Sequence, residues 1–306
     1  MLAIPAVILA ATVAGFVMVA RETAGGAVSA AASPDWLLLA AAFGIGALVQ
    51  PLRALAWRQT LGEVGFRAIY AASAVGSFLD TVLPGRLGEA SKVAVLRAAA
   101  AERWPGVPKA GGSLLATHLT EGIAFCLVGA TAGAFLPVPG WTRGALVGAV
   151  VLAAAGLLVA AALHRKLGRR LPSWAGRFLA SAAAPRVVLL RALAILVATW
   201  AVRCVGVLLT LNAVGVHASL GAALIYMTVT GLASTAPLLP GNVGVYQGAA
   251  VGALAMLGHA GSAAVAASLV MPVMASVVTA AAALVGLALY GRQFLVLPRA
   301  ALARRT

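Results

Sequence analysis

Long apolar segments separated by short charged ones dominate this sequence of 306 residues. Six of the segments could each cross a hydrocarbon layer of about 30 Å, because a helix rises about 1.5 Å per residue. The first segment has no basic residues ahead of it and is long enough to span, so we expect a retained helix rather than a cleaved signal peptide. We predict an all-α polytopic membrane protein in which residues 1–306 form one transmembrane domain. The six predicted spans are 2–20, 36–57, 111–136, 142–163, 186–212 and 262–290.

The composition excludes an ordinary soluble protein. Hydrophobic residues make up 62% of the chain and charged residues 9%, whereas about a quarter of the residues in globular domains are charged. The formal net charge of +15 does not indicate nucleic-acid binding, because the cations separate apolar segments instead of clustering on one solvated face. That distribution is typical of membrane topology signals and of contact with anionic lipids. We therefore expect membrane lipids as partners and no nucleic acid.

Two further apolar regions, 68–101 and 219–258, are each interrupted near the middle by a Pro-Gly pair. Proline removes a backbone donor and glycine relaxes helical geometry. Each region is therefore predicted to form two short helices joined by a turn. The pairs are Pro84-Gly85 and Pro240-Gly241.

Charge decides on which side these regions open. Residues 164–191 contain seven Arg and Lys residues and no acid, so the positive-inside rule places this segment in the cytoplasm, together with the basic C-terminus. Both placements require each Pro-Gly region to enter and leave the membrane on one side, as a re-entrant hairpin or a pair of spans. The same rule puts the N-terminus, Arg58, Arg67, Arg103 and Lys109 in the cytoplasm. It leaves Arg21, Glu22, Asp35 and Arg143 outside.

This topology predicts two inverted repeats. Residues 36–136 contain a span, a Pro-Gly hairpin and a span, and residues 186–290 contain the same series. The sequence Leu-Pro-Gly-Arg-Leu-Gly at 83–88 aligns with Leu-Pro-Gly-Asn-Val-Gly at 239–244. Because the charge rule opens the two hairpins on opposite sides, we expect the inverted-repeat architecture of many secondary transporters, with a substrate site near midplane where the broken helices meet.

Ionisable residues crowd around the first Pro-Gly pair. Asp80, Arg86, Glu89 and Lys92 lie within thirteen positions of an otherwise apolar region, which is costly in lipid unless they pair or line a cavity. Spacings of three place the last three near one helical face. The amides that begin the second helix could join Arg86 in binding a phosphate. The alternative is a self-contained ion-pair cluster that holds the hairpin together.

The second Pro-Gly pair is followed by polar, uncharged groups. Asn242, Tyr246 and Gln247 could contact a polar ligand, or the Asn and Gln amides could satisfy backbone groups that the helix break leaves free. Neither use requires a charge.

Three other sets of polar residues lie inside spans. His118 and Glu121, three residues apart, form either a proton relay or a packed hydrogen-bond link. Arg203 has no acid in its own half of the chain, so it needs a lipid phosphate or an acid from the other half. Arg53 is expected to snorkel to an interface.

No catalytic constellation is evident. The sequence lacks a nucleophile elbow, a Gly-rich phosphate loop with a lysine, and a His, Cys or Asp cluster with metal-ligand spacing. We expect no enzyme activity, no metal and no cofactor. Cys126 and Cys204 each lie inside an apolar run and are expected to be small buried side chains rather than a disulfide or metal site.

At both Pro-Gly pairs the chain resembles the lysylphosphatidylglycerol synthase transmembrane-region family, also described as flippase-like membrane proteins of bacteria and archaea. The resemblance rests on residues 83–92 and 239–247 and covers roughly residues 36–290. It implies a protein of the bacterial cytoplasmic membrane that moves a lipid or lipid-linked substrate between leaflets. The soluble synthase domain of fused members is not expected here, so lysyl transfer is not implied. Two departures from the family pattern are Gln247, in place of an acid, and residues 117–121, where an acid-Arg-x-x-acid pattern is more usual.

Our hypothesis from the sequence is a flippase-like transporter for an anionic lipid or lipid-linked substrate. The alternatives are a membrane-embedded transferase with Asp80 or Glu89 as base, and an accessory or scaffold subunit that joins lipid-biosynthesis enzymes of an aminoacyl-phospholipid, hopanoid or glycolipid pathway. The residues predicted to bind substrate are Asp80, Pro84, Gly85, Arg86, Gly88, Glu89, Lys92, His118, Glu121, Arg203, Pro240, Gly241, Asn242, Gly244, Tyr246 and Gln247.

Overall fold

The computed structural model describes residues 33–82, 87–100, 103–135, 140–167, 171–234, 244–259 and 261–303. These residues form helices joined by short turns, and they contain no strand. The predicted all-α membrane class is therefore confirmed. The predicted first span, 2–20, and both Pro-Gly pairs lie outside the described residues.

Four helical stretches of the described residues are long and apolar enough to cross a membrane. They coincide with four of the predicted spans, and a further helix, α7 (Gly140–Leu167), contains the fifth, 142–163. The last helix continues past the predicted end at 290 and ends at Ala303. The long helices are α2 (Trp36–Ala47) and α3 (Val49–Leu61), which together make one stretch, α6 (Val107–Phe135), α7 (Gly140–Leu167), α9 (Arg186–Ala213) and α12 (Ser262–Ala303).

Both Pro-Gly regions form pairs of short helices, as predicted. The first pair is α4 (Phe66–Val82) and α5 (Leu87–Ala100), and the second is α10 (Leu220–Ser234) and α11 (Val245–Met256). Contacts in the first pair run antiparallel, since Gly76 of α4 lies against Lys92 of α5 and Gly88 of α5 lies against Asp80 of α4. Helices α4 and α5 therefore lie side by side and antiparallel, as a hairpin requires.

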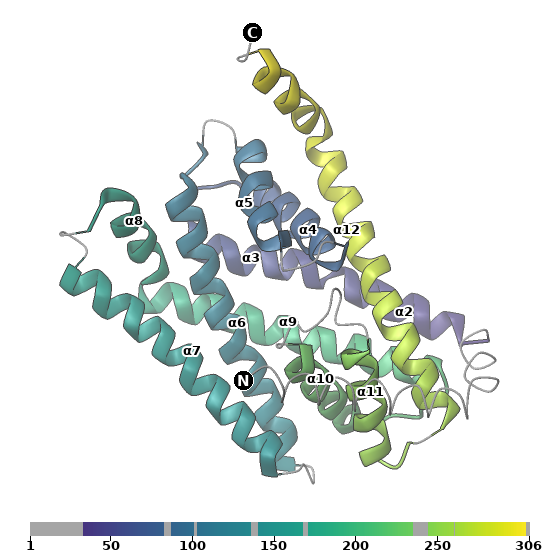
Figure 1. Ribbon diagram of the computed structural model, residues 1–306. Helices are drawn as coiled ribbons and strands as arrows, with labels where there is room; N and C mark the ends of the chain where they lie inside the picture. The colour runs from purple at the N-terminus through teal and green to yellow at the C-terminus, as the bar shows by residue number, and fades with distance from the viewer. Residues whose placement is uncertain are drawn as a thin grey trace.

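The two hairpins start from opposite ends of α9. Where α9 begins, Pro185 lines a pocket together with Thr60 at the end of α3 and Lys109 at the start of α6. Where α9 ends, the carbonyl of Ala213 accepts a hydrogen bond from the backbone N–H of Asp35, 2.9 Å away, just before α2. The α4/α5 pair therefore begins at the first end and the α10/α11 pair at the second. Figure 1 shows the two pairs in the upper and lower halves of the molecule.

Each hairpin packs on the last helix of the other half of the chain. Helix α4 contacts α12, α10 contacts α6, and α2 and α3 contact α9. A glycine permits close contact at both crossings: a Cβ on Gly286 would lie 3.1 Å from the Cα of Ala71, and a Cβ on Gly231 would lie 2.7 Å from the side-chain ring of Phe125. Small residues at helix crossings are typical of packing inside membranes.

Large apolar side chains cover much of the exterior. Leu37 is 80% exposed, Leu152 is 74% exposed and Leu284 is 67% exposed. Because a continuous apolar exterior is unfavourable in water, these helix faces are suited to contact with lipid tails. Both cysteines are free and buried, as predicted.

The basic segment 164–191 contains a helix that the sequence analysis did not anticipate. Helix α8 (Ser173–Ala182) follows Pro172 and contacts α6 and α7. It lies close to α6 at Gly112, where a Cβ would collide with the carbonyl of Phe178. Only a residue without a side chain permits this approach, so Gly112 positions α8.

Candidate functional site

Five charged or titratable side chains form one connected network inside the helix bundle. The Arg53 guanidinium on α3 donates to the carboxylate of Glu121 on α6 at 3.0 Å. The two nitrogens of His118, also on α6, lie 3.6 Å from Glu121 and 2.7 Å from Glu89 on α5. The Lys92 ammonium donates to the other oxygen of Glu89 at 2.5 Å. His118 therefore joins two ion pairs into a single chain of contacts, referred to below as the central network.

A seam of polar contacts between α3 and α6 fixes the Arg53 end of the central network. The indole N–H of Trp57 donates to the Ser113 hydroxyl at 3.1 Å. The hydroxyls of Thr60 and Thr117 lie 2.8 Å apart. Residues three or four positions apart lie on one face of a helix, so residues 53, 57 and 60 of α3 meet residues 113, 117 and 121 of α6 as one strip.

Close contact between α4 and α5 fixes the other end. Lys92 is 3% exposed, and a Cβ on Gly76 or on Gly88 would collide with the facing helix. Asp80 lies beside Gly88 and within electrostatic range of Glu89 and Lys92. Its buried Oδ1 atom has no hydrogen-bond partner in the described part of the chain. Asp80 therefore lies next to the central network, and its Oδ1 atom remains available to accept a hydrogen bond.

The charges lie deep along their helices. Glu121 is 14 residues from each end of α6, which corresponds to about 21 Å. Arg53 lies about 12 Å before the end of α3, and Arg203 about 15 Å before the end of α9. Charged side chains at such depth cost several kcal/mol each unless they are paired or hydrated. Pairing within the central network offsets this cost for Arg53 and Glu121.

Arg203 lies next to the central network without joining it. Its guanidinium carbon sits 4.9 Å from the ring centroid of Trp200, one turn earlier on α9. Trp200 in turn packs on Phe125 of α6, with ring centroids 4.9 Å apart. Arg203 is exposed, makes no ion pair with a carboxylate of the described residues, and lies within electrostatic range of Glu121 and Tyr246. A cation–π contact stabilises the guanidinium but leaves its donors available.

The second hairpin contributes hydroxyl groups rather than charges. The Tyr246 hydroxyl on α11 lies 3.2 Å from the Tyr226 hydroxyl on α10. The Gln247 side-chain oxygen accepts a hydrogen bond from the backbone N–H of Gly244 at 2.6 Å, at the start of α11. Gly244 has φ +86°, a conformation that favours glycine. The Gln247 oxygen therefore satisfies the freed backbone, which was one of the two uses predicted for this residue.

The structure brings together most of the predicted site residues that it describes. Asp80, Gly88, Glu89, Lys92, His118 and Glu121 lie in or beside the central network, and Arg203 and Tyr246 lie within electrostatic range of each other. Six predicted residues lie outside the described ranges: Pro84, Gly85, Arg86, Pro240, Gly241 and Asn242. Their substrate-binding role stays a prediction, as does that of the others.

The prediction that Arg53 snorkels to an interface was wrong. Its guanidinium turns inward to Glu121, and only 24% of its side chain is exposed. The sequence contained a signal for this inward orientation. Side chains that can form hydrogen bonds follow one another on α3 at intervals of three and four residues: Gln50, Arg53, Trp57 and Thr60. Gln50 is 2% exposed, so this strip of an apolar helix faces protein, not lipid.

The central network is suited to binding an anion by exchange. An anionic group could replace Glu89 at Lys92 or Glu121 at Arg53, and Arg203 offers donors without displacing any carboxylate. The described residues contain no group of three or more His, Cys, Asp or Glu side chains arranged to hold a metal ion.

A family model matches most of the chain. The family described as "Lysylphosphatidylglycerol synthase TM region" matches residues 3–286, which include every element of the site. No protein of curated function and no solved structure matches the chain significantly.

Proposed function

Because the chain belongs to the lysylphosphatidylglycerol synthase TM region family, we propose that it moves an anionic lipid or lipid-linked substrate between the leaflets of a membrane. The family connects the chain with membrane-lipid modification or transport. The observation that carries the proposal is Arg203, a cation deep in an apolar helix with no carboxylate partner among the described residues. Such a cation is costly in lipid unless an anion reaches it.

Headgroup binding begins at Arg203. Its position over Trp200 holds the guanidinium plane while its N–H groups contact a phosphate, and Arg–phosphate pairs are strong, geometrically specific contacts. Arg53 and Lys92 supply further positive charge when the anion displaces Glu121 or Glu89. The acyl or isoprenoid chains stay in the surrounding lipid, against the exposed leucines of the helix exterior.

Two inverted repeats, 36–136 and 186–290, carry the substrate across. Two observations support this organisation. The two hairpins start at opposite ends of α9, and α4 contacts α12 just as α10 contacts α6. Rocking of one set of helices against the other then exposes the central network to each leaflet in turn. The expected location is the bacterial cytoplasmic membrane, with both termini in the cytoplasm and lipid-synthesis enzymes as candidate partners.

The test is transfer of a fluorescent phosphatidylglycerol analogue across liposomes that contain the purified protein, measured as protection from a membrane-impermeant quencher. Arg203→Gln should slow the protein-dependent transfer at least about tenfold, because a hydrogen bond to a charged group contributes about 1.5–3 kcal/mol. Arg191→Gln is the matched control, since Arg191 is an exposed residue nearer the start of the same helix. Its rate should stay within about twofold of the unmodified chain.

Two results would overturn the proposal. One is the absence of any anionic-lipid transfer by the unmodified protein. The other is transfer by Arg203→Gln at the rate of the Arg191→Gln control.

A membrane-embedded transferase is the second candidate, favoured by the buried Asp80 Oδ1 atom without a hydrogen-bond partner in the described ranges. An unpaired carboxylate oxygen can act as a general base, whereas both oxygens of Glu89 are already bound by Lys92 and His118. Product formation from a lipid-linked donor by the purified protein, abolished by Asp80→Asn, would favour this function. If the protein is a transporter, neither the unmodified protein nor Asp80→Asn should form this product.

A further inference from the structure

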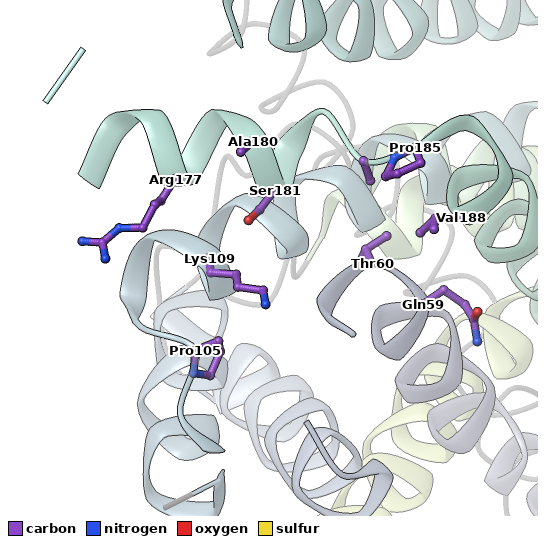
Figure 2. A pocket seen from close by; sticks show the side chains of 10 residues that line it. Gln59, Thr60, Pro105, Lys109, Arg177, Ala180, Ser181, Pro185 and Val188 are labelled. Atoms are coloured by element: carbon purple, nitrogen blue, oxygen red, sulfur yellow. The ribbon is translucent and has the colours of Figure 1, made fainter. Parts of the chain in front are cut away.

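A pocket separate from the central network lies where four helices meet. It has a volume of about 360 Å³, within the usual range of small-ligand sites. It is an open pocket, lined by the end of α3, the start of α6, the second half of α8 and the start of α9 (Figure 2). Its lining residues are Gln59, Thr60, Pro105, Lys109, Arg177, Ala180, Ser181, Ala184, Pro185 and Val188.

The pocket carries positive charge and hydrogen-bond donors. Figure 2 shows the Ser181 hydroxyl pointing from α8 toward Lys109 on α6, and Arg177 extending away from the other lining residues. Arg177 makes no ion pair with the described residues, and Lys109 has one carboxylate neighbour, Glu63, at 3.8 Å. Because the Glu63 side chain is 90% exposed, this pair is weak and leaves the ammonium free to bind another anion.

Two helices also begin at this pocket. Lys109 is in the first turn of α6, and Pro185 precedes the first turn of α9 without capping it by a side chain. The first amides of a helix lack partners within the helix and favour a negatively charged group nearby. Side chains and backbone therefore favour the same kind of ligand, an anion.

The residues around the pocket are of the kinds that favour a membrane surface. Helix α8 is strongly amphipathic and carries Trp174, which is 62% exposed, and tryptophan favours the boundary between lipid and water. The segment 164–191 around it contains seven Arg and Lys residues and no acid, a composition attracted to anionic lipid headgroups. An amphipathic helix of this kind lies in the plane of the headgroups.

We infer that this pocket binds the phosphate headgroup of an anionic phospholipid from the leaflet next to α8. The phosphate lies between Lys109 and Arg177, the Ser181 hydroxyl donates to it, and the acyl chains run out beneath α8. A bound lipid links α8 to the end of α3 and the start of α9, and so holds the two halves of the chain together on this side. The inference does not depend on transport, because none of its residues belongs to the central network.

The test measures phospholipid binding to the purified full chain by native mass spectrometry, with dioleoylphosphatidylglycerol and dioleoylphosphatidylcholine as probes. The double variant Lys109→Gln/Arg177→Gln should bind the anionic lipid at least about fivefold more weakly. The double variant Arg186→Gln/Arg191→Gln is the matched control, since it loses the same charge from exposed residues of the basic segment that do not line the pocket. The control should change binding by less than about twofold, and binding of the neutral lipid should not depend on the variant.

Glu63→Gln gives a test in the opposite direction. Removal of the carboxylate beside Lys109 should strengthen phosphatidylglycerol binding about two- to threefold, and an exposed substitution of this kind does not endanger folding. Equal losses in the two double variants, or unchanged binding in Glu63→Gln, would overturn the inference. Inorganic phosphate distinguishes the source of the anion: binding as tight as that of the lipid would identify a free phosphate ligand and exclude the lipid.

Discussion

The Arg53–Glu121 pair joins two helices through a charge-assisted hydrogen bond at 3.0 Å, with 24% and 14% of the respective side chains exposed. Removal of one member leaves the other charged and desolvated, which typically costs about 3–5 kcal/mol. Glu121→Gln should therefore lower the apparent melting temperature of the detergent-solubilised protein by about 5 °C or more. Thermal unfolding followed by intrinsic fluorescence measures the difference.

Two companion variants separate loss of pairing from loss of charge. Glu63→Gln removes a carboxylate from an exposed pair and should leave the melting temperature within about 2 °C of the unmodified chain. The double variant Arg53→Met/Glu121→Leu removes both charges at once and should recover most of the stability lost in Glu121→Gln. A Glu121→Gln protein as stable as Glu63→Gln would mean that the central pair is fully hydrated.

The α4/α5 hairpin depends on glycine at its closest contact. A Cβ on Gly88 would collide with the backbone and carboxylate of Asp80, so Gly88→Ala should push the two helices apart and destabilise the fold by about 1–3 kcal/mol. In Gly252→Ala the new methyl group meets nothing within 4 Å, and alanine favours a helix by about 1 kcal/mol over glycine. The thermal midpoints of the two variants should therefore move in opposite directions, and a shared direction would contradict the close packing at Gly88.

The elements with strong local causes were predictable from the sequence. A Pro-Gly pair in an apolar run breaks a helix wherever it occurs, so the α4/α5 and α10/α11 pairs followed without knowledge of their neighbours. Helix α8 was missed because a helix of 10 residues is too short to be a span, although its amphipathic pattern is a local signal for a helix. Its contact with Gly112, more than 60 positions away, could not be predicted from length and hydropathy.

In the candidate site, too, local features could be predicted from the sequence, whereas contacts between helices could not. The spacing of Glu89 and Lys92 predicted that the two side chains share one helix face, and their 2.5 Å contact confirms it. The link from His118 to Glu89 and the inward turn of Arg53 join different helices, so they depend on how α3, α5 and α6 pack. The sequence indicated that the charged residues pair with one another or line a cavity, but it did not indicate which residues on different helices would become partners.

At the scale of the whole molecule, the two hairpins lie at opposite ends of α9. The hairpin α4/α5 starts where α9 begins and α10/α11 starts where α9 ends, and each hairpin packs on the final helix of the other half. Each hairpin is therefore buried partly by its own half and partly by the opposite one. Rocking of one half against the other would have to change the contacts of α4 with α12 and of α10 with α6.

The opposed ends of α9 make a direct prediction about membrane sides. A cysteine at Val107, which is 57% exposed at the start of α6, lies at the end where the first hairpin begins, and a cysteine at Ser219, exposed just before α10, lies at the other. In intact cells a membrane-impermeant maleimide should label Ser219→Cys, while Val107→Cys should react only after the membrane is opened, because the positive-inside rule places the basic segment beside Val107 in the cytoplasm. Cys126 and Cys204 are 1% and 2% exposed, so they contribute little background, and a permeant maleimide should label both engineered positions. Labelling of both positions from one side would mean that the hairpins enter the membrane together, and two halves with that topology could not exchange a lipid between leaflets by rocking about α9.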